Sequence, residues 1–339
     1  MRAKNPGLAG LEISLPVVTC GITHAISVFA DLWTNPGDTV LLPDMMWGNY
    51  NMIMGVRKGV KITHFPLFDE KGGFNLAAVE ARAKELAARD GKVIVLFNFP
   101  HNPTGYSATE KECRALADIL IGIAESGKNV VAVLDDAYFG LFYEPEVMKE
   151  SLFAKLCGRH PRLLPIKLDG ATKEHYVWGL RVGFVTYGVQ CGAGDPRVVY
   201  EALEKKTAGS VRGSISNASH LSQTLVLQSL SNPVNPDEKA EKFRILKARA
   251  ERVRQLVGAA RYQRAFAAYP FNSGYFMCLR LKTVEAETLR VHLLERYGVG
   301  LISLGRHDLR VAFSCIDEDQ IETLFDIILQ GIADVEASG

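Results

Sequence analysis

The sequence has few of the features that mark secreted, membrane or metal-binding proteins. Its 339 residues include six cysteines, at positions 20, 113, 157, 191, 278 and 315, with no CxxC pair and no short spacing to histidine. This pattern argues against a disulfide framework and a zinc site, and it predicts free thiols that are mostly buried. The longest apolar run, near 130–134, is far shorter than a membrane span, and the first ten residues lack the apolar core of a signal peptide. We therefore expect a cytoplasmic protein.

An excess of charge of one sign is also missing. The formal net charge is +1, charged residues make up 23% of the chain and hydrophobic residues 47%. This balance is typical of a soluble globular protein and offers no field that would attract nucleic acid or an anionic membrane. The chain contains neither GxGxxG nor a P-loop, which argues against an oxidoreductase or a nucleotide-binding protein. No internal repeat or low-complexity tract is visible.

Short apolar runs alternate with helical stretches over the first two thirds of the chain. The runs at 39–43, 61–67, 92–99, 130–136 and 181–188 predict strands. The stretch 75–91 predicts a helix that ends at Gly91, and 107–127 predicts a helix that Ser107 or Thr109 caps. Repeated alternation of strand and helix predicts an α/β fold with a mostly parallel sheet flanked by helices.

The pattern changes near residue 233, where two prolines precede a long charged helix. We place a domain boundary there, between a large domain of residues 1–233 and a smaller C-terminal domain of residues 234–339. Apolar runs at 273–281 and 308–315, with two helices, give the smaller domain an α+β character.

Polar side chains follow the ends of three predicted strands, where open α/β sheets bind their ligands. Asn102 follows the run 92–99, Asp135 and Tyr138 follow the run at 130, and "LPIKLDGATK" leads to Lys173, eight positions before Arg181. Singly, such residues are usually solvated or cap a helix. Together they suit an anionic aromatic aldehyde, which needs an amine for a Schiff base, a carboxylate for a ring nitrogen, donors for a phenolate oxygen and cations for a phosphate.

Four motifs in one order carry a resemblance to a known family. "NPTG", "DDAY", "TKEHYVWGLRVG" and "LRVAFS" resemble, in order and approximate spacing, those of the class I/II pyridoxal-phosphate-dependent aminotransferases, the aspartate aminotransferase-like group of fold type I. The similarity runs from about residue 15 to the C-terminal region. It implies that residues 1–233 form the cofactor-binding domain, that pyridoxal 5'-phosphate is the cofactor, and that the protein is a homodimer.

The resemblance assigns roles to the residues at the strand ends. Lys173 is similar to the Schiff-base lysine, which also moves a proton between the substrate Cα and the cofactor. Asp135 corresponds to the carboxylate that keeps the ring nitrogen protonated, and Tyr138 and Asn102 to the pair that binds the phenolic oxygen. Arg181 resembles the arginine that binds the phosphate, a task for which a planar fork of donors is suited.

Further residues match the family near the phosphate and the substrate. "CGITHAI" resembles the start of a phosphate-binding helix, where Gly21, Ile22 and Thr23 would offer backbone N–H groups. Trp47 lies where the family often stacks an aromatic ring on the cofactor. Arg310 resembles the arginine that binds the substrate α-carboxylate. Arg212, four positions before a serine, resembles a residue that binds a second carboxylate in dicarboxylate-using members, although an aromatic substrate is equally compatible with the sequence.

Two departures from the family pattern are visible. A serine commonly lies three positions before the lysine, whereas this chain has Gly170 there and Thr172 directly before the lysine. One phosphate contact is then missing or replaced. The chain also opens almost at the phosphate-binding helix, whereas the family usually has several dozen more residues before it. Either the sequence begins at an internal methionine, or the protein lacks half of the lid that covers the substrate in the family. In the second case we expect a weakened dimer and impaired activity.

These matches predict an aminotransferase that exchanges an amino group between an L-amino acid, such as aspartate, glutamate or an aromatic amino acid, and a 2-oxo acid. Two alternatives remain at this point. A β-lyase on the same fold would share nearly all the cofactor residues. A shortened, catalytically impaired cofactor-binding protein would explain the missing segment, although the retained lysine, aspartate, tyrosine and arginine argue against it.

Overall fold

The computed structural model describes residues 1–192 and 194–338 and divides into two units. The first unit consists of Met1–Pro100, Ala108–Gly140 and Glu146–Asn235, and the second of His101–Ser107, Leu141–Pro145 and Pro236–Gly339. Two short segments that lie within the first unit in sequence therefore belong to the second in space. The sequence patterns did not indicate these two segments, because their partners lie more than a hundred residues away.

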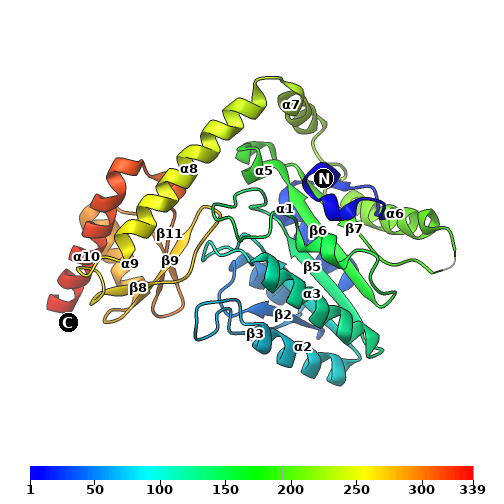
Figure 1. Cartoon of the computed structure of the whole chain (residues 1–339), viewed down its shortest axis with the longest axis horizontal. Coiled ribbons are helices and arrows are strands. Elements are labelled where there is room, and N and C mark those ends of the chain that lie inside the picture. The colour runs from blue at the N-terminus through cyan, green and yellow to red at the C-terminus, as the bar shows by residue number, and fades with distance from the viewer. Residues whose placement is uncertain (193, 339) are drawn as a thin grey trace. The chain divides into compact units, whose positions relative to one another are not determined.

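A seven-stranded sheet forms the centre of the first unit within the described residues, in the order β1-β7-β6-β5-β4-β2-β3 (Figure 1). The adjacent strands β3, β2, β4, β5 and β6 pair with one another in parallel. The strand β7 pairs antiparallel with both β6 and β1. This confirms the predicted mostly parallel sheet. The strands are β1 (Val17–Thr19), β2 (Thr39–Pro43), β3 (Lys61–Phe65), β4 (Lys92–Asn98), β5 (Asn129–Asp135), β6 (Leu163–Gly170) and β7 (Gly183–Tyr187).

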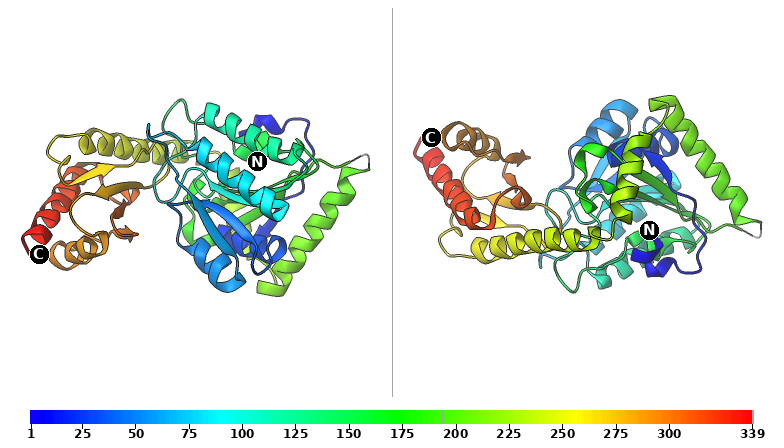
Figure 2. Two further views of the ribbon diagram at one scale, coloured as in Figure 1. Left: turned by 90° about the horizontal axis from the view of Figure 1, so that it is seen from below. Right: turned by 90° about the horizontal axis from the view of Figure 1, so that it is seen from above.

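Helices cover both faces of this sheet (Figure 2). On one face lie α1 (Gly21–Trp33), the short π-helical segment η3 (Asn51–Val56) and α6 (Pro196–Ile215). On the other face lie α2 (Leu76–Asp90), α3 (Glu110–Glu125) and α4 (Leu152–Leu156). Because both faces are covered, the central strands are buried almost throughout, which explains their continuous apolar sequences.

Local signals in the sequence set the ends of two of these helices. Asn75 caps α2, and Gly91 ends it in the left-handed conformation, with φ of +72°, which glycine adopts without a steric penalty. Thr109 and Glu112 form a capping box at the start of α3. Both predicted helices are confirmed, and Thr109 rather than Ser107 is the cap.

The second unit contains an antiparallel sheet in the order β10-β11-β9-β8. Its strands are β8 (Phe266–Ala268), β9 (Met277–Leu281), β10 (Ile302–Leu304) and β11 (Asp308–Val311), and its helices are α8 (Asn235–Val257), α9 (Ala286–Tyr297) and α10 (Ile321–Ser338). The charged helix that was expected after the two prolines is α8. Many apolar side chains of β9, β11 and α10 are buried, among them Leu279, Leu309 and Phe325.

The remaining elements are short helices and one longer helix that connect the larger ones. They are η1 (Arg2–Lys4), η2 (Pro6–Leu8), α5 (Ala171–Glu174), η4 (Trp178–Leu180), α7 (His220–Ser231), η5 (Phe313–Cys315) and η6 (Glu318–Gln320). Among the described residues, no helix combines the length and apolar character that crossing a membrane requires.

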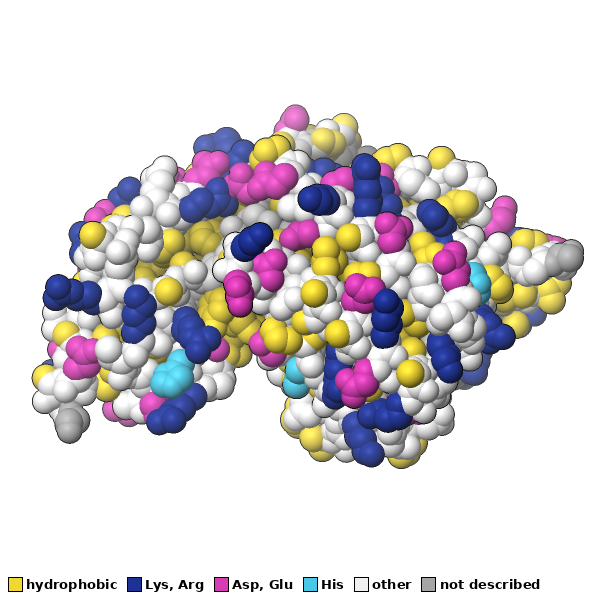
Figure 3. Space-filling model, turned by 60° about the horizontal axis from the view of Figure 1, so that its bottom comes forward, with side chains coloured by type: hydrophobic (Ala, Val, Ile, Leu, Met, Phe, Trp, Pro, Cys, Tyr) yellow, Lys and Arg dark blue, Asp and Glu magenta, His cyan; other side chains and the backbone are white. Residues whose placement is uncertain are grey.

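The cysteines and the surface charges follow the composition. All six cysteines are free thiols. Half of them, not most, are buried: Cys113, Cys157 and Cys278. On the face of the molecule shown in Figure 3, Lys and Arg side chains are interspersed with Asp and Glu side chains. This mixture is what a formal net charge of +1 leads one to expect.

Candidate active site

Lys173 lies on α5, the single helical turn that directly follows β6. The backbone N–H of Ala171 donates to the carbonyl of Val182 (3.1 Å), which ties this turn to β7. The side chain of Lys173 is half-buried, and its Nζ lies 5.2 Å from the centre of the Tyr138 ring. The turn therefore holds an amine near the carboxyl end of the sheet, where the sequence predicted it.

Burial lowers the pKa of the Lys173 ammonium, and the nearby Arg181 guanidinium lowers it further. The Asp135 carboxylate opposes both effects. Because only the neutral amine can attack a carbonyl carbon, a lowered pKa increases the reactive fraction at neutral pH. The surroundings of Lys173 thus favour a nucleophilic amine over a permanently charged side chain.

Asp135 is the last residue of β5, and its side chain is buried. One carboxylate oxygen accepts a hydrogen bond from the Tyr50 hydroxyl (2.6 Å), and the other accepts one from the backbone N–H of Ala137 (3.0 Å). Burial raises the pKa of this carboxyl, whereas the two hydrogen bonds and the charge of Lys173 lower it. The carboxylate is therefore held in a fixed orientation with few waters around it.

Tyr50 is a residue of this site that the sequence patterns did not single out. Its ring is buried, and burial together with the charge of Asp135 raises the pKa of its hydroxyl well above the ordinary value, so it remains a hydrogen-bond donor. Trp47, three positions earlier, is half-buried with its ring edge-on to Tyr50 at 5.5 Å and 88°. The signal available in the sequence was this WxxY pair after a predicted strand.

The first turn of α1 approaches Arg181 closely. A Cβ atom on Gly21 would lie only 2.5 Å from Nη2 of Arg181, and the φ of Gly21 is +76°. Arg181 itself has a left-handed backbone with φ of +53°. A Cβ atom on Gly183 would lie 2.5 Å from the Gly21 carbonyl carbon, so glycine at both positions lets β7 pack directly against α1.

Two of the predicted residues lie in the second unit, where they contact each other. Nη1 of Arg310, on β11, donates to Oδ1 of Asn102 (2.9 Å). The guanidinium of Arg310 also lies over the Phe276 ring, 4.2 Å from its centre. The ring orients the planar guanidinium, which suits it to bind a carboxylate.

Comparison with known proteins places the chain in a family. The family model described as aminotransferase class I and II matches residues 11–328. The chain belongs to the class I and II aminotransferases.

Individual relatives are distant in sequence. An aspartate aminotransferase of Sulfurisphaera tokodaii is 26% identical over 318 residues, which cover 89% of this chain and 71% of that protein. A probable N-acetyl-LL-diaminopimelate aminotransferase of Bacillus subtilis is 24% identical over 216 residues, which cover 64% of this chain and 47% of that protein. The chain spans about half the length of several curated relatives that it matches.

A solved structure shows the same fold. An aminotransferase from Anaerococcus prevotii matches with a TM-score of 0.82 at 23% sequence identity, covering 97% of this chain and 79% of that one. The likeness confirms the predicted fold: a mostly parallel sheet flanked by helices, followed by a smaller α+β domain.

Class I and II aminotransferases use pyridoxal phosphate, and the residues around Gly21 fit its phosphate group. The first N–H groups of a helix have no acceptor within the helix, and they attract an anion. The N-cap residue of α1, Cys20, provides no side-chain cap, so these N–H groups stay available beside the Arg181 guanidinium. Ile22 is buried and Thr23 is exposed, which leaves the Thr23 hydroxyl open to solvent.

The departure at Gly170 has a steric reason in this chain. A Cβ atom at this position would lie 2.9 Å from the Ile22 side chain and 3.0 Å from the Val182 carbonyl oxygen. A serine therefore does not fit here without a shift of its neighbours. Thr172, which lies two positions after Gly170, is buried and carries a hydroxyl group.

Arg212 lies on α6 and is exposed, with its Nη1 donating to the Ser216 hydroxyl (2.9 Å). Its own contacts indicate no ligand.

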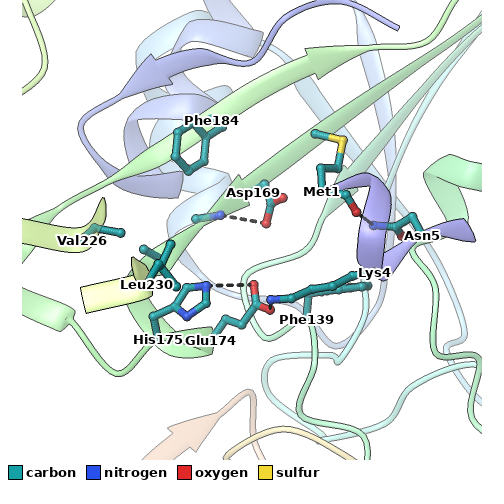
Figure 4. A pocket seen from close by; sticks show the side chains of 12 residues that line it. Met1, Lys4, Asn5, Phe139, Asp169, Glu174, His175, Phe184, Val226 and Leu230 are labelled. Carbon is teal, nitrogen blue, oxygen red and sulfur yellow. Dashed lines mark hydrogen bonds and ion pairs between the residues drawn. The ribbon is translucent and has the colours of Figure 1, made fainter. Parts of the chain in front are cut away.

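A cavity of about 320 Å³ borders α5 without involving any predicted site residue (Figure 4). Asp169, Glu174 and His175 contribute polar groups to it, and Phe139 and Phe184 contribute rings. The Glu174 carboxylate pairs with Lys4 and lies 3.7 Å from Nε2 of His175. The candidate active site therefore rests on the placement of side chains at the strand ends, not on the presence of this cavity.

Proposed function

We propose that this protein is a pyridoxal-phosphate-dependent aminotransferase that moves an amino group from an L-amino acid to a 2-oxo acid. The observation that carries the proposal is Lys173, a half-buried amine with a lowered pKa, following the strand next to the one that ends at the buried Asp135. Membership in the class I and II aminotransferases supports it.

Each residue then has a defined task. Pyridoxal phosphate supplies an electron sink, which allows a proton to leave the substrate Cα. Lys173 would hold the cofactor through its amine and would accept the proton that leaves Cα. Asp135 would bind the ring nitrogen and favour its protonated form, while the Tyr50 hydroxyl orients the carboxylate.

The remaining residues bind the two ends of the reactants. Arg181 and the first N–H groups of α1 bind the phosphate. By the family pattern, Tyr138 and Asn102 would bind the phenolic oxygen, and Trp47 would pack against the ring. Thr172 offers a hydroxyl to the phosphate in place of the serine that Gly170 excludes.

Arg310 binds the α-carboxylate of the amino acid in this proposal. A charge-assisted hydrogen bond contributes about 1.5–3 kcal/mol, so Arg310→Ala should raise KM for the amino acid by about 10- to 150-fold. The dissociation constant of the cofactor should change much less. Arg306→Ala, which removes an exposed arginine paired with Glu285, serves as the matched control. Equal loss of cofactor and substrate binding would contradict the assigned role of Arg310.

Acidic and aromatic amino acids are the first substrates to test. Several relatives are named aspartate aminotransferases, which supports aspartate or glutamate as the donor. Arg212 is a candidate for the second carboxylate of such a donor. Trp47 equally supports an aromatic substrate.

We also propose that the protein is a cytoplasmic homodimer. Six free thiols favour a reducing compartment. Exposed apolar side chains on α6 and α7 would be covered by a second copy: Val198, Val199, Ile215, Leu221, Leu225, Leu227 and Leu230. Light scattering during gel filtration should give about twice the mass of one chain. A monomer at all concentrations would contradict this part of the proposal.

The activity itself is tested with purified protein and added pyridoxal phosphate. Glutamate, aspartate or an aromatic amino acid is supplied with one 2-oxo acid at a time, and both products are quantified. We expect equal amounts of the donor's 2-oxo acid and of the new amino acid. Release of pyruvate and ammonia without an acceptor would favour a β-lyase instead. Cofactor binding without any product would indicate a protein that holds the cofactor but has lost catalysis.

A further inference from the structure

A second lysine, Lys167, lies on β6 and has no solvent exposure. Its Nζ lies 2.6 Å from Oδ2 of Asp136 and 2.9 Å from Oδ2 of Asp169, and 5.0 Å from the centre of the Phe139 ring. Moving an ammonium out of water is strongly unfavourable unless it is paired and hydrogen-bonded. Two carboxylates and an aromatic ring provide that pairing.

The two carboxylates belong to the chain segments that carry the reactive groups. Asp136 directly follows Asp135, and Asp169 lies four positions before Lys173. Asp135 pairs with Leu168 in the β5–β6 register, and the backbone N–H of Asp136 donates to the Leu168 carbonyl (2.9 Å). The ion cluster therefore sits where β5 and β6 end side by side (Figure 1).

The cluster and the reactive groups lie on opposite faces of the sheet. Side chains alternate along a strand, so Lys167 and Asp169 point away from the face of Leu168. Asp136 interacts with Ser151, the N-cap of α4, on the face that α2, α3 and α4 cover. Asp135 instead bonds to Tyr50, beside η3 on the other face.

Without its cation, this arrangement would bring two carboxylates together behind the site. Burial and the neighbouring Asp169 carboxylate raise the pKa of Asp136, Lys167 lowers it, and the balance leaves it at about 6. Removing Lys167 would therefore either protonate a carboxyl or push the ends of β5 and β6 apart. Both changes would reach Asp135 and Lys173 through the backbone.

We propose that Lys167 is a positioning residue: by bridging Asp136 and Asp169 it ties the end of β5 to the end of β6 and so holds Asp135 and Lys173 in their relative positions. The inference rests on the proposed function, because it matters only if these two groups act on one cofactor. The charge of Lys167 also lowers the pKa of the Asp135 carboxyl. The Tyr50 hydrogen bond and the charge of Lys173 lower the same pKa. Arg181 is the further charged group that acts on Lys173.

The test compares Lys167→Met and Asp169→Asn with a control, Lys155→Met. Lys155 lies on α4, over the same face of the sheet, and pairs with Glu110 (3.1 Å). The control variant therefore loses an ion pair but keeps the contacts of Lys167 with Asp136 and Asp169. Three quantities are measured: the dissociation constant of pyridoxal phosphate, the pH midpoint of its visible absorbance when bound, and the melting temperature of the cofactor-free protein.

Lys167→Met should weaken cofactor binding by about tenfold or more, since the carboxylate that binds the ring nitrogen is displaced. It should also raise the pH midpoint by about half a unit, because a buried positive charge is lost. Asp169→Asn removes a negative charge and should lower the midpoint. Lys155→Met should leave both quantities unchanged.

A fall in melting temperature with an unchanged dissociation constant and midpoint would show that Lys167 is merely structural and would overturn the inference. If Lys167→Met does not fold, Asp169→Asn decides, since the Asp169 side chain is partly exposed and asparagine has the same shape. An unchanged midpoint in that variant would also overturn the inference. A wild-type protein that never develops the cofactor absorbance would overturn the proposed function, and this inference with it.

Discussion

Two lysines six positions apart, Lys167 within β6 and Lys173 on α5 directly after it, have very different surroundings. Lys167 is fully buried and lies within 3 Å of two carboxylates. Lys173 is half-buried near an arginine, with one buried carboxylate acting on it. Burial lowers the pKa of both ammonium groups, but the two carboxylates raise that of Lys167 on balance, whereas the pKa of Lys173 stays lowered.

The comparison teaches that burial alone does not make a lysine reactive. Desolvation disfavours the charged form, and close carboxylates reverse this effect. The partners therefore decide which lysine becomes a nucleophile and which becomes a permanent cation. In this chain Lys167, the cation, lies within β6, and Lys173, the proposed nucleophile, lies on α5, which directly follows β6.

The largest expected effect is that of Lys173→Ala. Loss of the group that holds the cofactor and moves the proton should lower kcat by about 1,000-fold or more. The fold should be retained, since the side chain is only half-buried. Steady-state kinetics and circular dichroism measure the two quantities, with Lys205→Ala, an exposed lysine, as the control. Activity near that of the wild type would assign the role to another lysine.

Removing Arg181 should make the electrostatic surroundings of Lys173 less positive. In Arg181→Met the cation that lowers the pKa of Lys173 is gone, so the pKa of Lys173 should rise. The pH midpoint for attachment of pyridoxal, which lacks the phosphate, should therefore move upward. Affinity for pyridoxal phosphate should fall by about 100-fold, because charge-assisted hydrogen bonds to the phosphate are lost. An unchanged midpoint would show that Arg181 does not contribute to the lowered pKa of Lys173.

A smaller effect is expected from Tyr50→Phe. The variant removes a hydrogen bond of 2.6 Å to the Asp135 carboxylate and keeps the buried ring. Such a bond contributes about 1.5–3 kcal/mol, so kcat should fall by about tenfold or somewhat more. Cofactor-free stability and kinetics are measured together. A loss of stability with unchanged kcat would mean that Tyr50 only packs the core.

The pH dependence of stability is a test that does not involve catalysis. The folded-state pKa of Asp136, about 6, lies above the ordinary value of 3.8, because the carboxyl is buried. Its protonated form therefore stabilises the folded state below about pH 4, and this contribution is lost as pH rises through 6, at about 1.4 kcal/mol per unit. Urea unfolding of cofactor-free Asp136→Asn should lack this decline between pH 4 and 6. An identical slope in both proteins would contradict the assignment.

The sequence predicted much of the fold and several of the proposed site residues, for physical reasons that particular residues illustrate. Continuous apolar runs indicated the central strands, and the polar residues just after them indicated Asp135 and Lys173. Lys167 could not be recognised from the sequence, because a single lysine within "LPIKLDG" is expected to be exposed. Only the structure shows that Asp136, on the neighbouring chain segment, pairs with it. Tyr50 was missed because its partner lies 85 positions away.

Two further features depended on three-dimensional packing. The assignment of residues 101–107 to the second unit arises from backbone contacts of Gly105 with Asn272 and Ser273, which no local pattern encodes. The glycine at position 170 was visible as a departure from the family. Its reason, the closeness of Ile22 and Val182, required the structure.

The most direct test of the central claim is to find which lysine holds the cofactor. Protein loaded with pyridoxal phosphate is reduced with borohydride, digested, and mapped by mass spectrometry. The comparison of the two lysines predicts a phosphopyridoxyl group on Lys173 and none on Lys167. Labelling of Lys167, or of neither lysine, would contradict it.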